Sequence, residues 1–193
     1  MIDQAMTFLR DQLNQYLKLK ANILEDKVGF IKGDNSEAVN FETDSITLML
    51  VNLEEERVLR PADRYEVTIR NGLRIGGSPE IRLNLFVLFV ARFNDYTQSM
   101  KLLSLVMQFF QSHFVFDHEN SPDLSQDIEK LIVELNTLSF NEQNEIWNAL
   151  RRTYLPSALY KIRMIVFRDI ETLAVGSEVG SMERTLLKND NHN

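Results

Sequence analysis

The densest group of residues that could do chemistry is a run of three glutamates at the end of a hydrophobic stretch, "LMLVNLEEERVLR", which spans residues 48–60. Paired carboxylates can act as general acid and base when they share a pocket. Side chains of an extended chain alternate between two faces, so Glu54 and Glu56 point one way, while Glu55 and Arg57 point the other. Because the sequence indicates no pocket around them, the run favours a solvated or partner-facing strand end over a catalytic dyad.

The other candidate groups do not form a recognisable site. His113 and His118 lie five positions apart on either side of a predicted short strand, which is not the spacing of a helical metal pair. The glycines between residues 72 and 77 lack the lysine and the strand-to-helix context of a phosphate loop. Ser139 is explained by a helix cap, and the chain contains no Gly-x-Ser-x-Gly elbow and no cysteine. We therefore predict that the protein is not an enzyme and holds no cofactor or metal.

Composition restricts the class of partner. The 193 residues carry a formal net charge of −7, and the 21 basic residues are scattered, so nucleic acid is a poor partner. The N-terminus has an acidic residue at position 3 and no apolar run typical of a secretory signal. No stretch approaches the roughly 18 apolar residues of a membrane span. Since a chain without cysteine suits a reducing compartment, we expect a soluble cytoplasmic protein without direct membrane insertion.

Hydrophobic periodicity predicts the elements of the first half. Residues 2–17 have the three- and four-residue spacing of an amphipathic helix, and residues 27–32 form a short strand. The stretch 45–53 is apolar on both faces and predicts an inner strand. Residues 64–70 end at Asn71-Gly72, which favours a tight hairpin turn. Residues 80–93 are the candidate central strand, whose wetter ends are marked by Arg82, Asn84 and Arg92.

The second half predicts two further helices and two long strands. Asn94 or Asp95 can cap a helix. Its expected core face consists of Tyr96, Met100, Leu103, Met107 and Phe110. Residues 128–138 read as a half-buried strand with Leu131, Val133 and Leu135 inward, and residues 158–170 as the last strand. Ser139 and Glu142 form a capping box ahead of a helix whose Trp147 packs on the sheet. The order of elements predicts a single α+β domain over residues 1–173, with a mixed sheet packed by helices, followed by a polar tail at 174–193.

Four blocks of the sequence resemble one protein family: "MIDQAMTFLRDQLNQYL", "NLEEER", "LNLFVLFVARF" and "LPSALYKIRM". In this order they are similar to the N-terminal domain of cap, or tube-terminator, proteins of contractile injection systems, the phage-tail-like particles that include antifeeding prophages and Photorhabdus virulence cassettes. The resemblance departs at residues 61–79 and in the tail. It implies a fold similar to phage tail terminators and a structural role without a reaction.

The resemblance also implies partners. A cap of this kind forms a ring, expected to be sixfold, at the distal end of the inner tube, stops tube growth and connects to the last sheath layer. Its partners would be further copies of itself, the inner tube protein, the sheath protein and a second cap paralogue. Assembly would occur in the bacterial cytoplasm before the protein becomes part of the particle. The alternative is a sheath-side adaptor or assembly factor of the same particle without its own ring.

Within such a ring the glutamate run becomes a candidate subunit contact. Each interface of a cyclic ring joins two different patches, so an acidic patch must meet a complementary one on the next subunit. The acidic side with its neighbouring arginines is predicted at Glu54, Glu55, Glu56, Arg57 and Arg60. The candidates for the complementary side are Arg70, Arg74, Arg151, Arg152 and Arg163.

Overall fold

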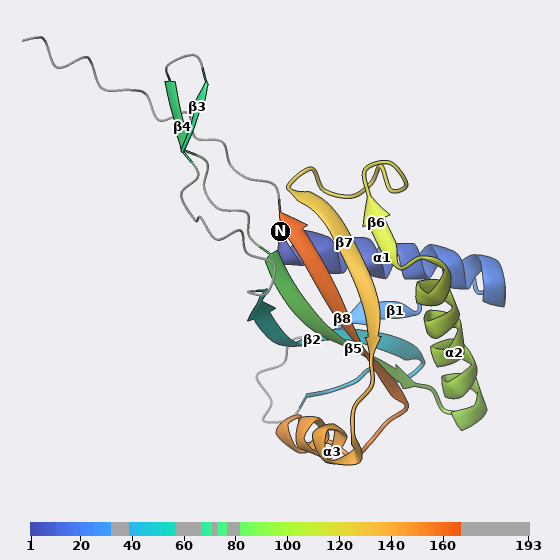
Figure 1. Ribbon diagram of the computed structural model, residues 1–193. Coiled ribbons are helices and arrows are strands. Elements are labelled where there is room, and N and C mark those ends of the chain that lie inside the picture. Colours follow the sequence, from blue (N-terminus) through green and yellow to red (C-terminus); the bar gives the residue numbers. More distant parts are fainter. Residues whose placement is uncertain (32–38, 57–66, 71–72, 77–81, 167–193) are drawn as a thin grey trace, which may run out of the picture. The chain divides into compact units, whose positions relative to one another are not determined.

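The computed structural model describes residues 1–31, 39–56, 67–70, 73–76 and 82–166 (Figure 1). Three helices are present in these ranges: α1 (Ile2–Ala21), α2 (Tyr96–Ser112) and α3 (Phe140–Ala149). The strands are β1 (Val28–Phe30), β2 (Ser45–Glu55), β3 (Val67–Arg70), β4 (Leu73–Gly76), β5 (Arg82–Arg92), β6 (Val115–Asp117), β7 (Ile128–Asn136) and β8 (Ser157–Val166). Each predicted helix and strand that falls in the described ranges is confirmed in type, as is the α+β class.

The helices and a six-stranded sheet belong to one compact unit, and the β3–β4 hairpin belongs to a second. In the hairpin, β3 and β4 are antiparallel and Arg70 lies opposite Leu73, as expected of strands joined by two residues. The turn itself, Asn71-Gly72, lies outside the described residues. The same holds for the predicted domain boundary at residue 173 and for the tail, which both stay predictions.

The sheet has the strand order β1-β2-β5-β8-β7-β6, so β5 is central, as its apolar sequence predicts. Strand β1 runs parallel to β2, and the other four pairings are antiparallel. The register of β2 against β5 shifts between Leu50 and Asn52, which leaves Val51 as a bulge. Both outer strands are short, and β1 reaches only the first part of β2, where Phe30 lies opposite Leu48.

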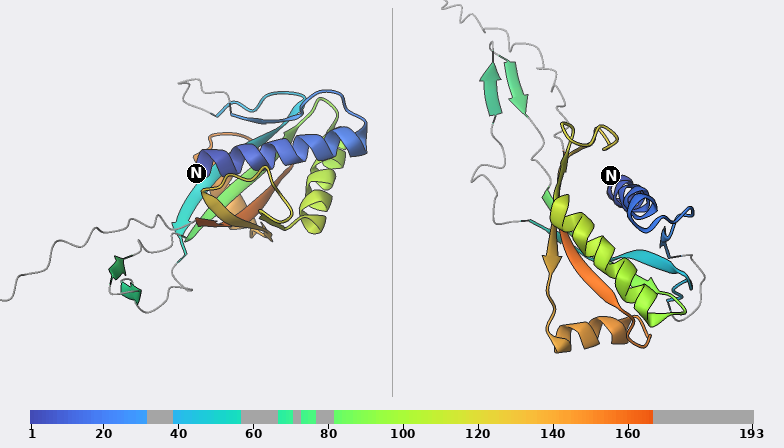
Figure 2. Two further views of the ribbon diagram at one scale, coloured as in Figure 1. Left: turned by 90° about the horizontal axis from the view of Figure 1, so that it is seen from above. Right: turned by 90° about the vertical axis from the view of Figure 1, so that its right-hand side faces the viewer.

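One face of the sheet is covered by α1 and α2 (Figures 1 and 2). The side of α2 that packs there differs from the predicted one, because Tyr96, Met100 and Met107 are exposed. The buried residues of α2 are Ser99, Leu102, Leu103, Val106, Phe109 and Phe110. The helix has apolar residues on more than one side, so its spacing alone left two possible core faces.

The second face is covered by α3 over only part of its area. Trp147 is buried there against Met49, Leu88 and Leu159, which lie side by side on three adjacent strands. Phe41, from the segment before β2, packs beside Trp147 in a tilted arrangement with ring centroids 5.8 Å apart. The predicted packing of Trp147 on the sheet is thus confirmed. Figure 1 shows α3 at the end of the sheet where β7 ends and β8 begins.

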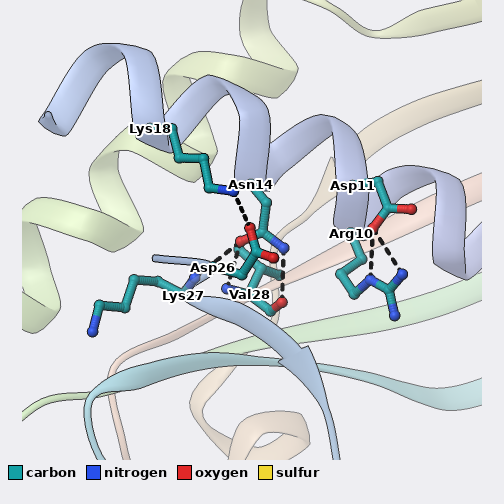
Figure 3. A network of polar contacts seen from close by, with 7 residues as sticks. All are labelled: Arg10, Asp11, Asn14, Lys18, Asp26, Lys27 and Val28. Atoms are coloured by element: carbon teal, nitrogen blue, oxygen red, sulfur yellow. Dashed lines mark hydrogen bonds and ion pairs between the residues drawn. The ribbon is translucent and has the colours of Figure 1, made fainter. Parts of the chain in front are cut away.

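Asn14 attaches the edge strand β1 to helix α1 (Figure 3). Its side chain is buried, Nδ2 donates to the carbonyl of Val28 at 2.9 Å, and Oδ1 accepts from the N–H groups of Lys27 and Val28 at 3.0 and 2.9 Å. Lys18 and Asp26 form an ion pair at 2.7 Å close by. Asn14 thus closes the backbone hydrogen bonds at the start of β1.

Replacing Asn14 by alanine should therefore destabilise the fold. The change leaves backbone groups of Val28 and Lys27 without partners in a buried setting, which should lower the free energy of unfolding by about 2–3 kcal/mol. Urea denaturation followed by circular dichroism measures this loss. Gln15→Ala on the exposed side of the same helix turn is the matched control and should change stability little. Equal effects of the two substitutions would rule out the proposed role of Asn14.

Candidate assembly surface

Strand β2 leaves the core without leaving the sheet. Residues 46–49 are buried, whereas Leu50, Asn52, Leu53, Glu54 and Glu55 are exposed. The strand still pairs with β5 to its end, where Glu55 lies opposite Leu83. The hydrophobic stretch can therefore run into glutamates without a turn, because the backbone pairing continues where side-chain burial stops.

The three glutamates have different surroundings. Glu54 is exposed, and its carboxylate accepts from Asn52 Nδ2 at 3.2 Å. Glu55 is also exposed. Glu56 follows the strand with a side chain only 13% exposed, accepts from Asn84 Nδ2 at 3.0 Å and lies 3.9 Å from Lys161 Nζ. Glu56 thus belongs to the subunit's own structure, whereas Glu54 and Glu55 are exposed residues of β2.

Asn84 is the polar residue that sequence reasoning misplaced. The sequence predicts a wetter end of the central strand at this residue, but Asn84 is only 4% exposed. Its Oδ1 lacks a hydrogen-bond partner, and so does Nε of Arg163, which lies directly opposite on β8. The guanidinium of Arg163 is paired instead with Glu134 on β7. Alternation alone could not reveal this, since Glu56 and Arg163, which lie beside Asn84, are distant from it in sequence.

The predicted basic residues Arg151 and Arg152 lie directly after α3. The helix begins with the predicted capping box, in which the N–H and hydroxyl of Ser139 both donate to Glu142 at 2.8 Å. Both hydrogen bonds lower the pKa of the Glu142 carboxyl, and the bond from the N–H has the larger effect. The helix ends in a turn where Arg151 has a φ of 52°.

That turn keeps both arginines at the surface. The N–H of Arg152 donates to the carbonyl of Trp147 at 3.2 Å, and its guanidinium donates to the carbonyl of Val39. Arg151 and Arg152 are exposed. Helix α3 thereby fixes the position of two adjacent cations relative to the buried Trp147.

The structure does not bring the two predicted sets together within one subunit. Glu54 lies opposite Asn84 on the second face, whereas α3 packs on that face over Leu88 and Leu159. Such separation is what a contact between different patches of two subunits requires. Of the other predicted residues, Arg163 is engaged by Glu134, and Arg57 and Arg60 lie outside the described residues, as do the side chains of Arg70 and Arg74.

His113 and His118 contact separate parts of the chain. His113 stacks on Phe109 with ring centroids 4.8 Å apart, and Nε2 of His118 lies 2.9 Å from the carbonyl oxygen of Ile128. Within the ranges that the structure describes, no cluster of three His, Cys, Asp or Glu side chains is placed to hold a metal ion. No helix in those ranges is long and apolar enough to cross a membrane.

Solved structures share this architecture. The sheath/tube terminator of an extracellular contractile injection system, PVC, in its extended state is similar with a TM-score of 0.56 and 16% sequence identity, over 96% of this chain and 64% of that chain. The tube-terminating cap of the anti-feeding prophage has a TM-score of 0.49 and 14% identity, over 91% of this chain and 59% of that chain. No curated protein matches the sequence. This chain spans less than two thirds of the length of the PVC terminator and of the anti-feeding prophage cap.

The first of these likenesses shows that the chain shares its fold with that sheath/tube terminator. The sequence model of one family covers nearly the whole chain, from residue 4 to residue 180. The chain belongs to that family, which is described as the Pvc16 N-terminal domain. The resemblance expected from the four sequence blocks is confirmed.

The different roles of Glu54 and Glu56 can be separated by stability. Glu56→Ala removes a charge-assisted hydrogen bond to the buried Asn84 and should lower the free energy of unfolding by about 1–2 kcal/mol. Glu54→Ala removes an exposed carboxylate and should leave it within about 0.5 kcal/mol of the wild type. Both values come from urea denaturation of the purified chain at low concentration. A larger loss for Glu54→Ala than for Glu56→Ala would contradict these assignments.

Proposed function

We propose that this chain is a structural subunit that ends the inner tube of a contractile injection system and links it to the last sheath layer. The observation that carries the proposal is the family match over residues 4–180, on a fold shared with a sheath/tube terminator. The inner tube protein and the sheath protein are then its partners, and a second cap paralogue is a further candidate. The protein would assemble in the bacterial cytoplasm and remain in the particle.

A structural role, without a reaction, also suits the polar residues of the second sheet face. Lys161 lies close to Glu56, which follows β2, and Arg163 pairs with Glu134 on the adjacent strand β7, so these charges contact one another within the subunit. Cross-strand pairs of this kind stabilise the shape of a sheet surface. These charged side chains pair with one another inside the subunit. Such pairing suits a protein whose function is assembly.

The proposed assembly is a ring of six copies that matches a sixfold tube. In a closed ring every subunit uses one patch toward the copy on one side and a different patch toward the copy on the other. We assign Glu54 and Glu55 to the first patch, together with Arg57 and Arg60 that follow them in sequence. Arg151 and Arg152 form the second patch. Charge pairs at the rim of an interface set its register and its choice of partner more than its affinity.

Charge reversal tests the ring and its patches together. Native mass spectrometry across a concentration series should give a hexamer for the wild type, and Glu54→Arg/Glu55→Arg should raise the concentration needed for assembly by tenfold or more. Adding Arg151→Glu/Arg152→Glu in the same chain should restore assembly, because the pairs are re-formed with opposite signs. The matched control is Glu119→Arg/Glu129→Arg, which makes the same charge change at exposed positions elsewhere.

Co-sedimentation with purified inner tubes tests the tube-ending role separately. The wild type should bind at tube ends in substoichiometric amounts and stop the tubes from growing further. A protein that forms no ring alone but binds tube ends would retain this role and lose only the self-assembly part of the proposal. Absence of binding to both tube and sheath proteins would overturn the proposed function.

A further inference from the structure

A groove opens beside α3 at the end of the sheet. It has a volume of about 230 Å³ and lies where β7 ends and β8 begins, with Trp147 and Leu159 among its lining residues. Three of its other apolar residues are unusually exposed: Leu135 at 51%, Tyr154 at 55% and Met107 at 41%. The volume is several times the roughly 30 Å³ that one water occupies, so an aliphatic side chain fits. Exposed apolar side chains gathered around a hollow are typical of an interaction site.

The strand next to the groove has an open edge. β6 pairs with β7 only at residues 130–132, and one further bond joins the N–H of Val133 to the carbonyl of Phe114 at 2.8 Å. Backbone groups alternate in direction along a strand, so Leu135 is the next residue of β7 that directs its backbone outward. No described residue pairs with that edge. An open edge beside an apolar hollow fits an extended segment that adds as a strand.

The exposed end of β2 is a segment of this kind. Within the described part of the chain, β1 pairs only with residues 46–48 of β2, and Leu53 is 45% exposed. The N–H of Glu56 donates toward β5, to Arg82 at 2.9 Å, so by alternation Leu53 directs its backbone away from β5. The N–H of Leu53 is held by Oδ1 of Asn52 at 2.9 Å, an exposed contact that a carbonyl of another chain can replace.

Charges of opposite sign lie beside the two surfaces. On β2, Leu53 is followed directly by the exposed Glu54 and Glu55. At the groove, Tyr154 is preceded by the exposed Arg151 and Arg152. An apolar contact between Leu53 and the groove would therefore place acidic residues near basic ones.

We infer that the outer edge of β2 of one copy packs against the open edge of β7 of the next copy, with Leu53 in the groove lined by Leu135, Trp147 and Tyr154. The partner is a second copy of this chain. The contact is heterologous, since the two edges are different parts of the same sheet. It rests on the proposed ring only for the number of copies, and it supplies the apolar contact that the charge pairs by themselves lack.

Engineered cysteines can test this contact cleanly, because the chain contains no cysteine. A chain with Leu53→Cys and Leu135→Cys should form, on mild oxidation, a ladder of disulfide-linked oligomers on a non-reducing gel. An equal mixture of the two single variants should stop at dimers. A disulfide requires Cα atoms within about 7 Å, so the ladder reports direct proximity. The matched control pairs Leu53→Cys with Leu24→Cys, another strongly exposed leucine, and should give at least tenfold less crosslinked product.

A second variant tests the contact without a crosslink. Leu135→Asp places a charge at the groove and should raise the concentration needed for assembly by tenfold or more, without loss of helical circular dichroism signal. A ladder as strong in the Leu24 control as in the Leu135 pair would overturn the inference. Hexamers without a Leu53–Leu135 crosslink would overturn it too, but would leave the ring in place. A chain that stays monomeric and gives no ladder would also overturn it, whereas the tube-ending role is decided by binding to tubes.

Discussion

The structure depends on the burial of β5 on both of its faces. Between residues 85 and 91 every side chain of this strand except the half-buried Phe86 is buried, so cover is needed above and below. On one face α1 and α2 supply it together. On the other, α3 reaches only the part around Leu88, and its single buried residue is Trp147. Burial of apolar surface is the dominant stabilising contribution to folding. The position of these helices therefore determines where the sheet can carry polar residues without loss of stability.

The part of the second face on which none of the described helices packs is polar for that reason. Asn84, Lys161 and Arg163 lie on this face of the two central strands. A further helix packed on them would require apolar residues at these positions. Glu56 and Glu134 supply partners from the strands on either side. The acidic run at the end of β2 follows the same pattern. Glu56 contacts Asn84 and Lys161 of the sheet, whereas Glu54 and Glu55 are exposed.

Among the described residues, the short outer strands leave the sheet with two partly open edges. β1 and β6 each have three residues, and each pairs with only part of its longer neighbour. Open edges promote aggregation in a protein that works alone, and single-chain proteins usually cover or charge them. In a subunit of a ring they are useful instead, because backbone groups and apolar side chains at the two edges become available to neighbouring copies. The exposed leucines on β2 and β7 and the charges beside them agree with such a use.

Much of the fold could be predicted from the sequence, because alternation in β2, β5 and β8 and the capping box of α3 depend on residues close together in the chain. The predicted core face of helix α2 was right for Leu103 and Phe110 and wrong for Tyr96, Met100 and Met107, since apolar residues occupy more than one side of the helix and only the sheet selects between them. The roles of Asn14, Asn84 and Glu56 were likewise outside the reach of local patterns. Val28, which Asn14 binds, is 14 positions away in the printed sequence; Arg163, opposite Asn84 in the sheet, is 79 positions away, and Lys161, beside Glu56, is 105 positions away. The sequence by itself thus determined the elements and the family, whereas tertiary structure decided which polar residues serve the subunit and which remain at its surface, because that division depends on contacts between distant segments.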